Sequence, residues 1–236
     1  METLDSVQSR RALIRSALII AGGAAVTACT SRVATVAARP IALPPPMAAP
    51  PVVATVPAKV SRLITPQGVR PELFKRAVAA LDRHSMRIAA HDRIAIADFS
   101  VPSAQPRFHL VHLGTGQVES LLVAHGIGSD PEHTGLLHRF SNDPGSNATC
   151  EGAFVASEYY QGQHGASQRL DGLDASNNNA LDRAIVIHGA WYSNPDMIAK
   201  WGKLGRSQGC FAVGESDLEK VFLRLGAGRM IYSAKV

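Results

Sequence analysis

A histidine and a cysteine toward the C-terminal end of the chain are of types, and in a setting, that could support acyl-transfer chemistry. His188 ends a short apolar run, residues 184–187, which is typical of a buried strand. Cys210 lies 22 positions later, in a glycine-flanked turn. A cysteine attacks as the thiolate, and a nearby imidazole can take its proton. The pair is therefore a candidate nucleophile and general base, although a lone cysteine is more often a small buried apolar residue.

The turn before Cys210 has a composition that suits a nucleophile. Gly209 allows the backbone to come close to a substrate, because glycine has no Cβ. In that setting the backbone N–H groups of Gly209 and Cys210 could point at the negative oxygen of a tetrahedral intermediate. We therefore predict that Ser207, Gln208 and Gly209 shape the oxyanion side of the site.

The His-Gly pair at 188–189 and the Gly-Arg-Ser-x-Gly-Cys turn resemble the signature of the L,D-transpeptidase catalytic domain (YkuD-like), and more closely that of its murein L,D-transpeptidase branch. The similarity extends over roughly residues 89–236, and it is specific because several spaced motifs agree in order. The other matching segments are VAHG at Val123–Gly126, FSN at Phe140–Asn142, YxGxHGxSxRLxGL ending at Leu173, and RAIVIHGAWY beginning at Arg183.

This resemblance implies an enzyme that acts on peptidoglycan stem peptides as a cysteine acyltransferase. Cys210 would attack a stem-peptide carbonyl with help from His188, form a thioester, and pass the acyl group to an amine of a second stem. Two donors stay open, the carbonyl of diaminopimelate and that of L-alanine. Two other functions stay open as well: an L,D-carboxypeptidase that trims stems with water as acceptor, and a non-catalytic exported wall-binding module in which Cys210 is structural.

The segment 127–183 is rich in polar and turn residues, and we expect it to be loop-rich. The resemblance implies that it forms the wall of a peptide cleft, where Arg169 would pair with a substrate carboxylate. A salt bridge that fixes the loop is the alternative for Arg169. His125 ends a strand as His188 does, and it either lines the cleft or is structural. The expected substrate-binding residues are Tyr160, His164, Ser167, Arg169, His125, Gly189, Trp191, Tyr192 and Arg206, with Trp191, Tyr192 and Trp201 in a lid.

The chain departs from the family pattern around its cysteine. Many members carry histidine where this chain has Gln208, and an apolar residue followed by arginine or asparagine where it has Phe211-Ala212. The turn therefore has no second imidazole of its own. The closer branch varies at this histidine position, so we expect catalysis to be intact.

The three cysteines, Cys29, Cys150 and Cys210, show no metal-type Cys-x-x-Cys spacing. Zinc-hydrolase spacings such as His-Glu-x-x-His are absent from the sequence too, and His109 and His112 point to opposite faces of an expected strand. We therefore expect no metal and no cofactor. A Cys150–Cys210 disulfide is the alternative to a free Cys210, and the role of Cys150 stays open.

The N-terminal segment has the pattern of an export signal. Arg10-Arg11 resembles a twin-arginine motif, and the apolar run at 16–28 that follows is too short for a stable membrane span. The sequence Val-Thr-Ala-Cys that ends at Cys29 resembles a lipobox. We therefore expect Cys29 to be lipidated and the mature protein to be a periplasmic lipoprotein tethered to a membrane. A simple signal peptide cut near residues 37–38 is the alternative.

Composition divides the chain into three parts. We expect the export signal at 1–28, a tether rich in proline and alanine at 29–63, and a catalytic domain at 64–236. The net charge of +5 and the pI of about 9.4 suit anionic wall polymers or lipid headgroups as surroundings. No basic stripe interleaved with aromatic residues indicates nucleic acid as a partner.

Within the domain, short strand-like segments outnumber helices, which favours a mainly β, sandwich-like domain with peripheral helices. Helical spacing predicts a helix over 65–86, and a second helix begins at the capping-box sequence Ser216–Glu219. The expected strands are 93–99, 107–113, 118–124, 184–187 and 229–233.

Overall fold

The computed structural model describes residues 66–236. The predicted export signal, the tether and the candidate lipidation site Cys29 lie outside these residues, as does the expected start of the catalytic domain. Within the described part of the chain, no helix has both the length and the apolar character that crossing a bilayer requires.

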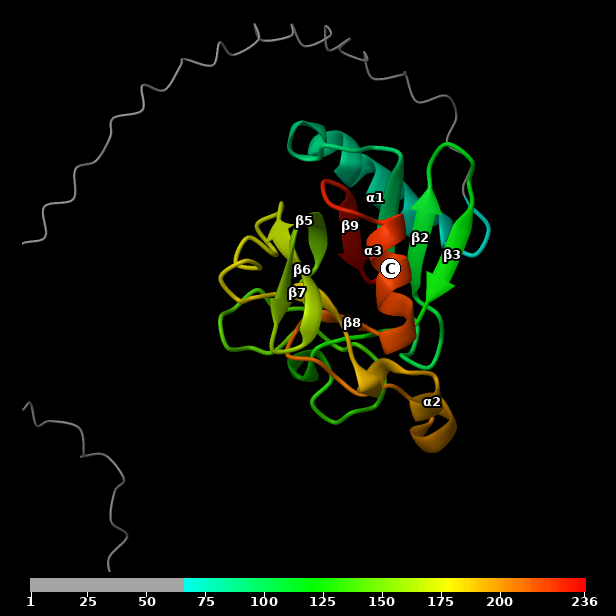
Figure 1. Cartoon of the computed structure of the whole chain (residues 1–236), viewed down its shortest axis with the longest axis vertical. Helices are drawn as coiled ribbons and strands as arrows, with labels where there is room; N and C mark the ends of the chain where they lie inside the picture. The colour runs from blue at the N-terminus through cyan, green and yellow to red at the C-terminus, as the bar shows by residue number, and fades with distance from the viewer. Residues whose placement is uncertain (1–65) are drawn as a thin grey trace, which may run out of the picture. The chain divides into compact units, whose positions relative to one another are not determined.

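The described residues form one sheet of nine strands in the order β3-β2-β1-β9-β5-β6-β7-β8-β4 (Figure 1). Most neighbours are antiparallel, but β1 runs parallel to β9, and β7 runs parallel to β8. The mainly β fold that the sequence predicted is confirmed. The strands are β1 (Arg93–Asp98), β2 (Phe108–His112), β3 (Val118–Leu121), β4 (Val123–Ala124), β5 (Gly152–Gly162), β6 (Gly165–Gly172), β7 (Val186–Gly189), β8 (Phe211–Val213) and β9 (Met230–Ala234).

The sheet curls, so that strands far apart in the sheet order face each other across the main apolar core. Phe108 of β2 and Phe211 of β8 lie near opposite ends of the order, yet their ring centroids are 6.4 Å apart. Phe154, from the central strand β5, packs edge-on against the same Phe211 ring at 5.5 Å. This curling gives a sandwich-like core from a single continuous sheet.

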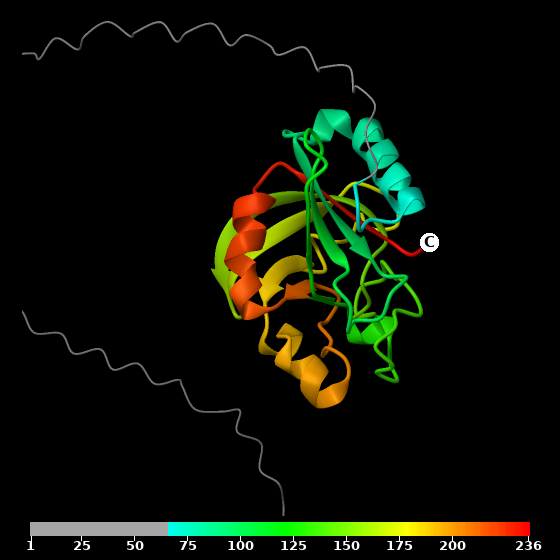
Figure 2. The ribbon, with the colours of Figure 1, turned by 90° about the vertical axis from the view of Figure 1, so that its right-hand side faces the viewer.

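Helices cover the sheet on two sides, as Figure 2 shows for α1 and α3. Pro71 begins α1, where a missing N–H costs nothing, and the helix packs Phe74 and its other apolar residues on the face of β1 that carries Ile96. On the other side, Val221 of α3 packs into the main core. The helices are α1 (Pro71–Arg83), α2 (Asp196–Trp201) and α3 (Leu218–Arg224), with 3-10 turns at Ser85–Arg87, Ile127–Ser129, Trp191–Ser193 and Glu215–Asp217.

The expectation that residues 127–183 are loop-rich is correct for 127–151 and 173–183, which contain no strand, but it missed β5 and β6, the two longest strands of the sheet. These strands form a hairpin with Gln163-His164 at its tip. Some of their polar residues, such as Glu158, lie on a solvent-exposed part of the hairpin, while Ser167 and Gln168 are buried, and a half-polar strand is easily mistaken for loop. The consequence for function is that β6 pairs directly with β7, the strand that carries His188.

Three smaller differences separate the predicted elements from those of the structure. The predicted helix 65–86 is shorter, because α1 starts only at Pro71. The predicted strand 118–124 is divided into β3 and β4, and β4 leaves β2 to pair with β8. The sequence Ser216–Glu219 makes no capping hydrogen bond, since a 3-10 turn leads into α3 instead.

Candidate active site

Two adjacent parallel strands bring the histidine and the cysteine together. In the β7–β8 ladder, His188 is paired with Ala212, and Cys210 lies two residues before Ala212. Cys210 is the last residue of the turn that leads into β8, and its thiol and the imidazole of His188 line the same cleft.

One hydrogen bond fixes the tautomer of His188. Its Nδ1 lies 2.9 Å from the carbonyl oxygen of Gly189. A carbonyl only accepts, so Nδ1 carries the proton and Nε2 keeps a free lone pair. Burial lowers the pKa of His188 below its ordinary value, the Gly189 bond partly offsets this, and the nearby His164 lowers the pKa further. At neutral pH the imidazole is therefore in the unprotonated form that a general base needs.

Cys210 is a free thiol that is only 8% exposed. Its Sγ lies 3.6 Å from the carbonyl oxygen of Ala184, which accepts the thiol proton. Burial is the main influence on the thiol and raises the pKa of Cys210, while Arg183 acts in the opposite direction. The resting site therefore holds a neutral thiol beside a neutral imidazole. Cys150 is free as well, so the alternative Cys150–Cys210 disulfide is not formed.

Ser207 braces the turn that carries Cys210. Its hydroxyl donates to the carbonyl of Cys210 at 2.7 Å and accepts the N–H of Gly209 at 3.1 Å. The Gly209 N–H is thus engaged inside the turn, whereas the sequence led us to expect that it points at an oxyanion. The N–H of Cys210 is the donor that the turn can still offer. Gln208 is exposed and lines the cleft.

Gly209 is required by the packing behind the turn. Its φ of 115° lies in a region that favours glycine. A Cβ there would come within 2.8 Å of the Ala148 carbonyl oxygen and within 3.2 Å of Arg183 Nη2. Gly126 packs against the same turn, since a Cβ on Gly126 would lie 2.8 Å from Gly209 Cα. The close approach that the sequence predicted is therefore between segments of the protein itself.

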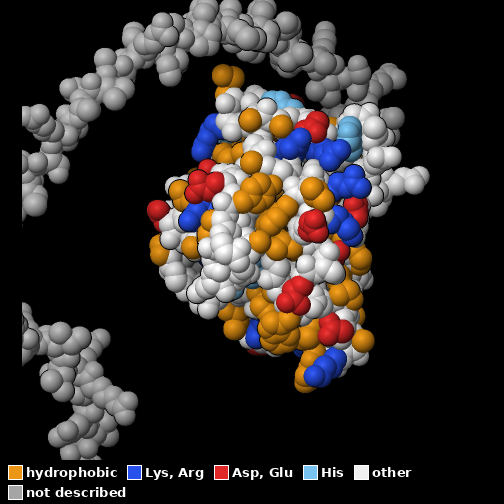
Figure 3. Space-filling view, in the orientation of Figure 1, with side chains coloured by type: hydrophobic (Ala, Val, Ile, Leu, Met, Phe, Trp, Pro, Cys, Tyr) orange, Lys and Arg blue, Asp and Glu red, His pale blue; other side chains and the backbone are white. Residues whose placement is uncertain are grey.

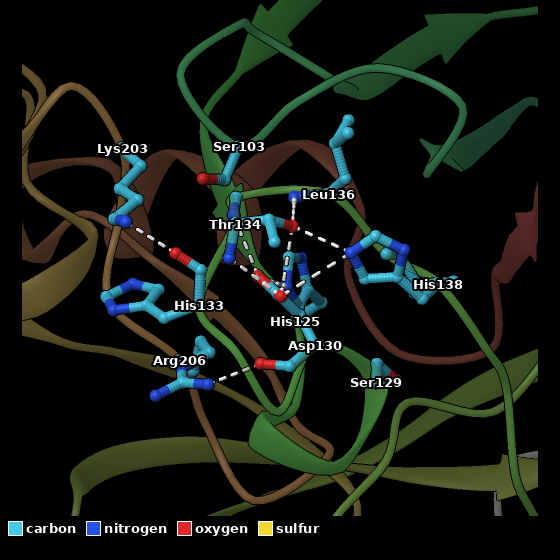
Figure 4. A network of polar contacts seen from close by, with 12 residues as sticks. Ser103, His125, Ser129, Asp130, His133, Thr134, Leu136, His138, Lys203 and Arg206 are labelled. Carbon is cyan, nitrogen blue, oxygen red and sulfur yellow. Dashed lines mark hydrogen bonds and ion pairs between the residues drawn. The ribbon is translucent and has the colours of Figure 1, made fainter.

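His125 is held in a buried polar network, not in the cleft (Figure 4). Its Nδ1 accepts a hydrogen bond from Arg107 at 2.8 Å, and its Nε2 lies 3.3 Å from a carboxylate oxygen of Asp130. Burial, followed by the charge of Arg107, lowers the pKa of His125 to about 3. The ring is therefore neutral, and Nε2 donates to Asp130. The main-chain oxygen of His125 accepts the N–H of Ser207 at 2.9 Å, so the network supports the turn of Cys210 from behind.

The same network anchors the segment that leads into the turn (Figure 4). Arg206 donates to the carbonyl oxygens of Asp130 and Pro131. Lys203 donates to the carbonyl oxygen of His133. The carboxylate of Asp130 accepts N–H groups of its own loop at 2.8 Å, which keeps these carbonyls in place. The position of Cys210 is thus set by contacts from a loop some eighty residues earlier in the chain.

The cleft beside Cys210 has a volume of about 450 Å³, within the size range of ligand sites. Among residues 66–236, no group of three or more His, Cys, Asp or Glu side chains is arranged to hold a metal ion. Beside His188 and Cys210, the predicted residues that line the cleft are Tyr160, His164, Tyr192, Arg206, Ser207 and Gln208. The predicted residues that lie outside it are His125, Ser167, Arg169, Gly189, Trp191 and Gly209.

Arg169 is committed to partners within the hairpin. Its Nε lies 2.9 Å from a carboxylate oxygen of Glu158, and its guanidinium lies over the ring of Tyr160, 4.3 Å from the centroid. The salt bridge that the sequence left open as an alternative is therefore present. Arg169 influences the cleft through Tyr160, which lines it.

The expected lid residues Trp191 and Trp201 are exposed, at 65% and 59%, and neither lines the cleft. Tyr192 does line it, and burial raises the pKa of Tyr192 to about 12. Hydrophobic side chains gather at the α2 end of the molecule in Figure 3.

Sequence reasoning missed Arg183, which lines the cleft beside Cys210. Its guanidinium donates to the carbonyl oxygens of Ser141 and Ala148 at 2.7 and 2.6 Å, and to the Cys150 sulfur at 2.8 Å. The one signal in the sequence was its place at the head of the RAIVIHG segment. The other unpredicted lining residues are Pro144, Gly145, Asn147, Gln163, Asp182, Ala184 and Val186.

Comparisons with known proteins identify the family. The family model described as the L,D-transpeptidase catalytic domain (YkuD_2) matches residues 65–233. No curated protein sequence matches the chain. Distant similarity in structure links it to an L,D-transpeptidase from Mycobacterium smegmatis (13% identity, 61% of this chain and 58% of that chain, TM-score 0.36) and to the helical cell shape determining protein Pgp2 from Campylobacter jejuni (12%, 63% and 49%, TM-score 0.40). The chain thus spans about half of the length of these two chains.

At such TM-scores the family assignment rests on the match to the family model. That match covers most of the chain and contains the β7–β8 pair, the cleft and the turn of Cys210. The chain therefore belongs to the L,D-transpeptidase catalytic domain family.

Proposed function

We propose that this protein is a peptidoglycan L,D-transpeptidase in which Cys210 is the nucleophile and His188 the general base. One observation carries the proposal. The Gly189 carbonyl holds the proton of His188 on Nδ1, so the free lone pair of Nε2 is available in the same cleft as the Cys210 thiol. Family membership supports peptidoglycan stem peptides as the class of substrate.

Acylation begins from the neutral pair. When a stem-peptide carbonyl enters the cleft, Nε2 of His188 takes the proton of the Cys210 thiol, and Sγ attacks the carbonyl carbon. The negative charge moves to the carbonyl oxygen, where the Cys210 N–H can stabilise it. Collapse of this intermediate breaks the peptide bond, and His188 returns the proton to the leaving amine. The product is a thioester on Cys210.

Deacylation decides between the transferase and the carboxypeptidase. An amine of a second stem loses a proton to His188, attacks the thioester and forms a cross-link, and the Cys210 thiol is regenerated. Water in place of the amine would release a trimmed stem. Tyr160 and Tyr192 line the cleft as walls for the peptide, and Arg206 adds a positive charge that suits substrate carboxylates.

We also propose the cellular setting that the sequence indicates. Residues 1–28 would direct export, Cys29 would carry a lipid, and residues 29–63 would tether the domain 64–236 to a periplasmic membrane surface. Replacing Cys29 by serine should then move the protein from the membrane fraction to the soluble periplasmic fraction. Soluble wild-type protein with an N-terminus beyond Cys29 would contradict the lipid anchor.

The test of the proposed activity is product analysis on purified muropeptides. Wild-type protein should convert stem peptides into cross-linked dimers, and Cys210→Ala should not. Cys150→Ser is the matched control, because Cys150 is the other buried free cysteine of the described residues and should leave product formation unchanged. Trimmed monomers alone would indicate a carboxypeptidase. Equal turnover by wild type and Cys210→Ala, or no turnover by either, would contradict the proposal.

A further inference from the structure

The tip of the β5–β6 hairpin lies over the ring of the proposed general base. His164 and His188 are stacked, with ring centroids 4.4 Å apart and an angle of 19° between the ring planes. The pairing of β6 with β7 places the hairpin for this contact, because Ser167 of β6 is the register partner of His188 on β7. His164 is exposed on its outer side and belongs to the wall of the cleft.

The stack adds a constraint that the hydrogen bond of His188 does not provide. The outer torsion of a histidine side chain has a broad energy profile, so a single bond at Nδ1 fixes the ring plane only loosely. A parallel ring at 4.4 Å closes one face of the imidazole and limits its rotation. With Nδ1 bonded and one face covered, Nε2 is the part of the ring left for proton transfer.

The stack also depends on charge. A neutral ring accommodates the imidazolium that His188 becomes when it takes the thiol proton, whereas a protonated His164 would repel it. The other titratable groups that line the same cleft are Tyr160, Asp182, Arg183, Tyr192, Arg206 and Cys210. None of these groups is stacked on the His188 ring. Removing the side chain of His164 is therefore the most direct way to uncover that ring.

We propose that His164 is a positioning residue, which fixes the ring of His188 and shields it from water so that Nε2 meets the Cys210 thiol. This inference rests on the proposed function, because it assigns His188 the role of base. It predicts that an aromatic ring at position 164 matters and that its nitrogen atoms do not. His164→Phe keeps a stacking ring, His164→Ala removes it, and His91→Ala is the matched control, since His91 is an exposed histidine outside the cleft.

The first test is independent of turnover. In the Cys210→Ala background, which removes the thiol, the titration of His188 is followed by NMR. His164→Ala should raise the pKa of His188 toward the ordinary value, because water can then reach the uncovered ring and solvate its protonated form; His164→Phe should keep the pKa low, and His91→Ala should not move it. An unchanged titration in His164→Ala would overturn the proposal, whether or not the protein proves to be a transpeptidase.

The second test separates positioning from substrate binding. His164→Ala should lower kcat by roughly tenfold to a hundredfold, the cost expected of a misplaced catalytic group, with KM changed less than about threefold. His164→Phe should restore kcat to within about threefold of wild type. A rise in KM alone, or failure of His164→Phe to restore kcat, would show that the histidine contacts substrate instead. If Cys210→Ala remained active, the proposed function would fail. The NMR titration of His188 would still test whether His164 covers its ring.

Discussion

Acidification should destabilise this protein mainly through one buried histidine that supports the turn of Cys210. His125 is 1% exposed, and its Nδ1 accepts a hydrogen bond from Arg107. A proton added to Nδ1 would face the N–H of a guanidinium and remove that bond. Burial, followed by the charge of Arg107, therefore keeps His125 neutral in the folded protein, with a pKa lowered to about 3, while an unfolded chain protonates histidine at about 6.5.

The sign and the size follow from this difference. Between these two pKa values the unfolded chain binds more protons than the folded protein, so stability rises with pH. The contribution of His125 is complete above about pH 6.5 and is lost progressively as the pH falls toward 3. Each pH unit in this window corresponds to about 1.4 kcal/mol, so the loss at pH 4.5 is about 2–3 kcal/mol. This is a large share of an ordinary free energy of unfolding of about 5–15 kcal/mol.

Urea unfolding between pH 4.5 and 7 measures the effect, with His125→Gln as the matched variant. Glutamine can accept from Arg107 and donate to Asp130, and it does not titrate. Asp130, whose pKa is lowered in the folded protein, stays ionised at the lower limit of pH 4.5, and the other carboxylates contribute equally in the two proteins. Burial also lowers the pKa values of His109 and His188, but both contribute equally in the two proteins.

The variant should lose less stability than the wild type between pH 6.5 and 4.5, by about 2–3 kcal/mol. Its stability at pH 7 is expected to be lower, since the amide replaces the ring imperfectly. Parallel loss of stability in both proteins across this window would refute the reasoning, because it would mean that His125 is not held neutral.

The remaining predictions concern the site. Gly209→Ala should abolish turnover and lower stability by roughly 1–3 kcal/mol, because the new Cβ meets backbone at a φ of 115°; Gly116→Ala, also at positive φ but with open space around it, should leave activity unchanged, as thermal unfolding and turnover assays will show. His188→Gln should lower kcat by about 10²–10⁴-fold, and a loss below tenfold would exclude His188 as the base. In the wild type, kcat/KM should fall on the acid side at a pH below 6.5, since burial lowers the pKa of His188; a midpoint above 7 would contradict this. Cys150→Ser should retain activity within about threefold, because a hydroxyl can accept the Arg183 hydrogen bond as the sulfur does; loss of turnover would give Cys150 a role in the chemistry.

The raised pKa of Cys210 changes how its thiol should be probed. An activated cysteine is commonly recognised by fast alkylation near neutral pH. Here burial keeps the thiol protonated in the resting protein, so slow alkylation would be expected of an active enzyme as well as of a structural cysteine. Product formation therefore separates these two classes, and thiol reactivity in the absence of substrate does not.

Local signals explain what could be predicted from the sequence. An apolar run that ends in His188 and a glycine-flanked turn at Cys210 are each readable within a few residues, and both side chains lie in the cleft. The mainly β class was also predictable, because short strand patterns outnumber helical ones. The hairpin of β5 and β6 was not, since it carries many polar residues, some exposed as Glu158 is and some buried as Gln168 is, and such a composition is easily mistaken for loop.

Contacts between distant segments explain what could not be predicted. Arg183 is beside Cys210 because the loop around Ala148 folds against the turn. No sequence pattern near Arg183 indicates this contact. Similarly, Arg169 lies outside the cleft and pairs with the carboxylate of Glu158 across the hairpin. Both outcomes depend on contacts between segments that are distant in the sequence, which sequence patterns alone do not determine.

Intact-mass and peptide-mapping mass spectrometry of the protein mixed with a muropeptide donor tests the central claim most directly. We predict a stem-peptide acyl adduct on the peptide that carries Cys210, absent from Cys210→Ala and present in Cys150→Ser. The adduct should disappear, with release of a cross-linked product, when an amine acceptor is added. Turnover of the donor without any adduct on Cys210, or an adduct on another residue, would contradict the account.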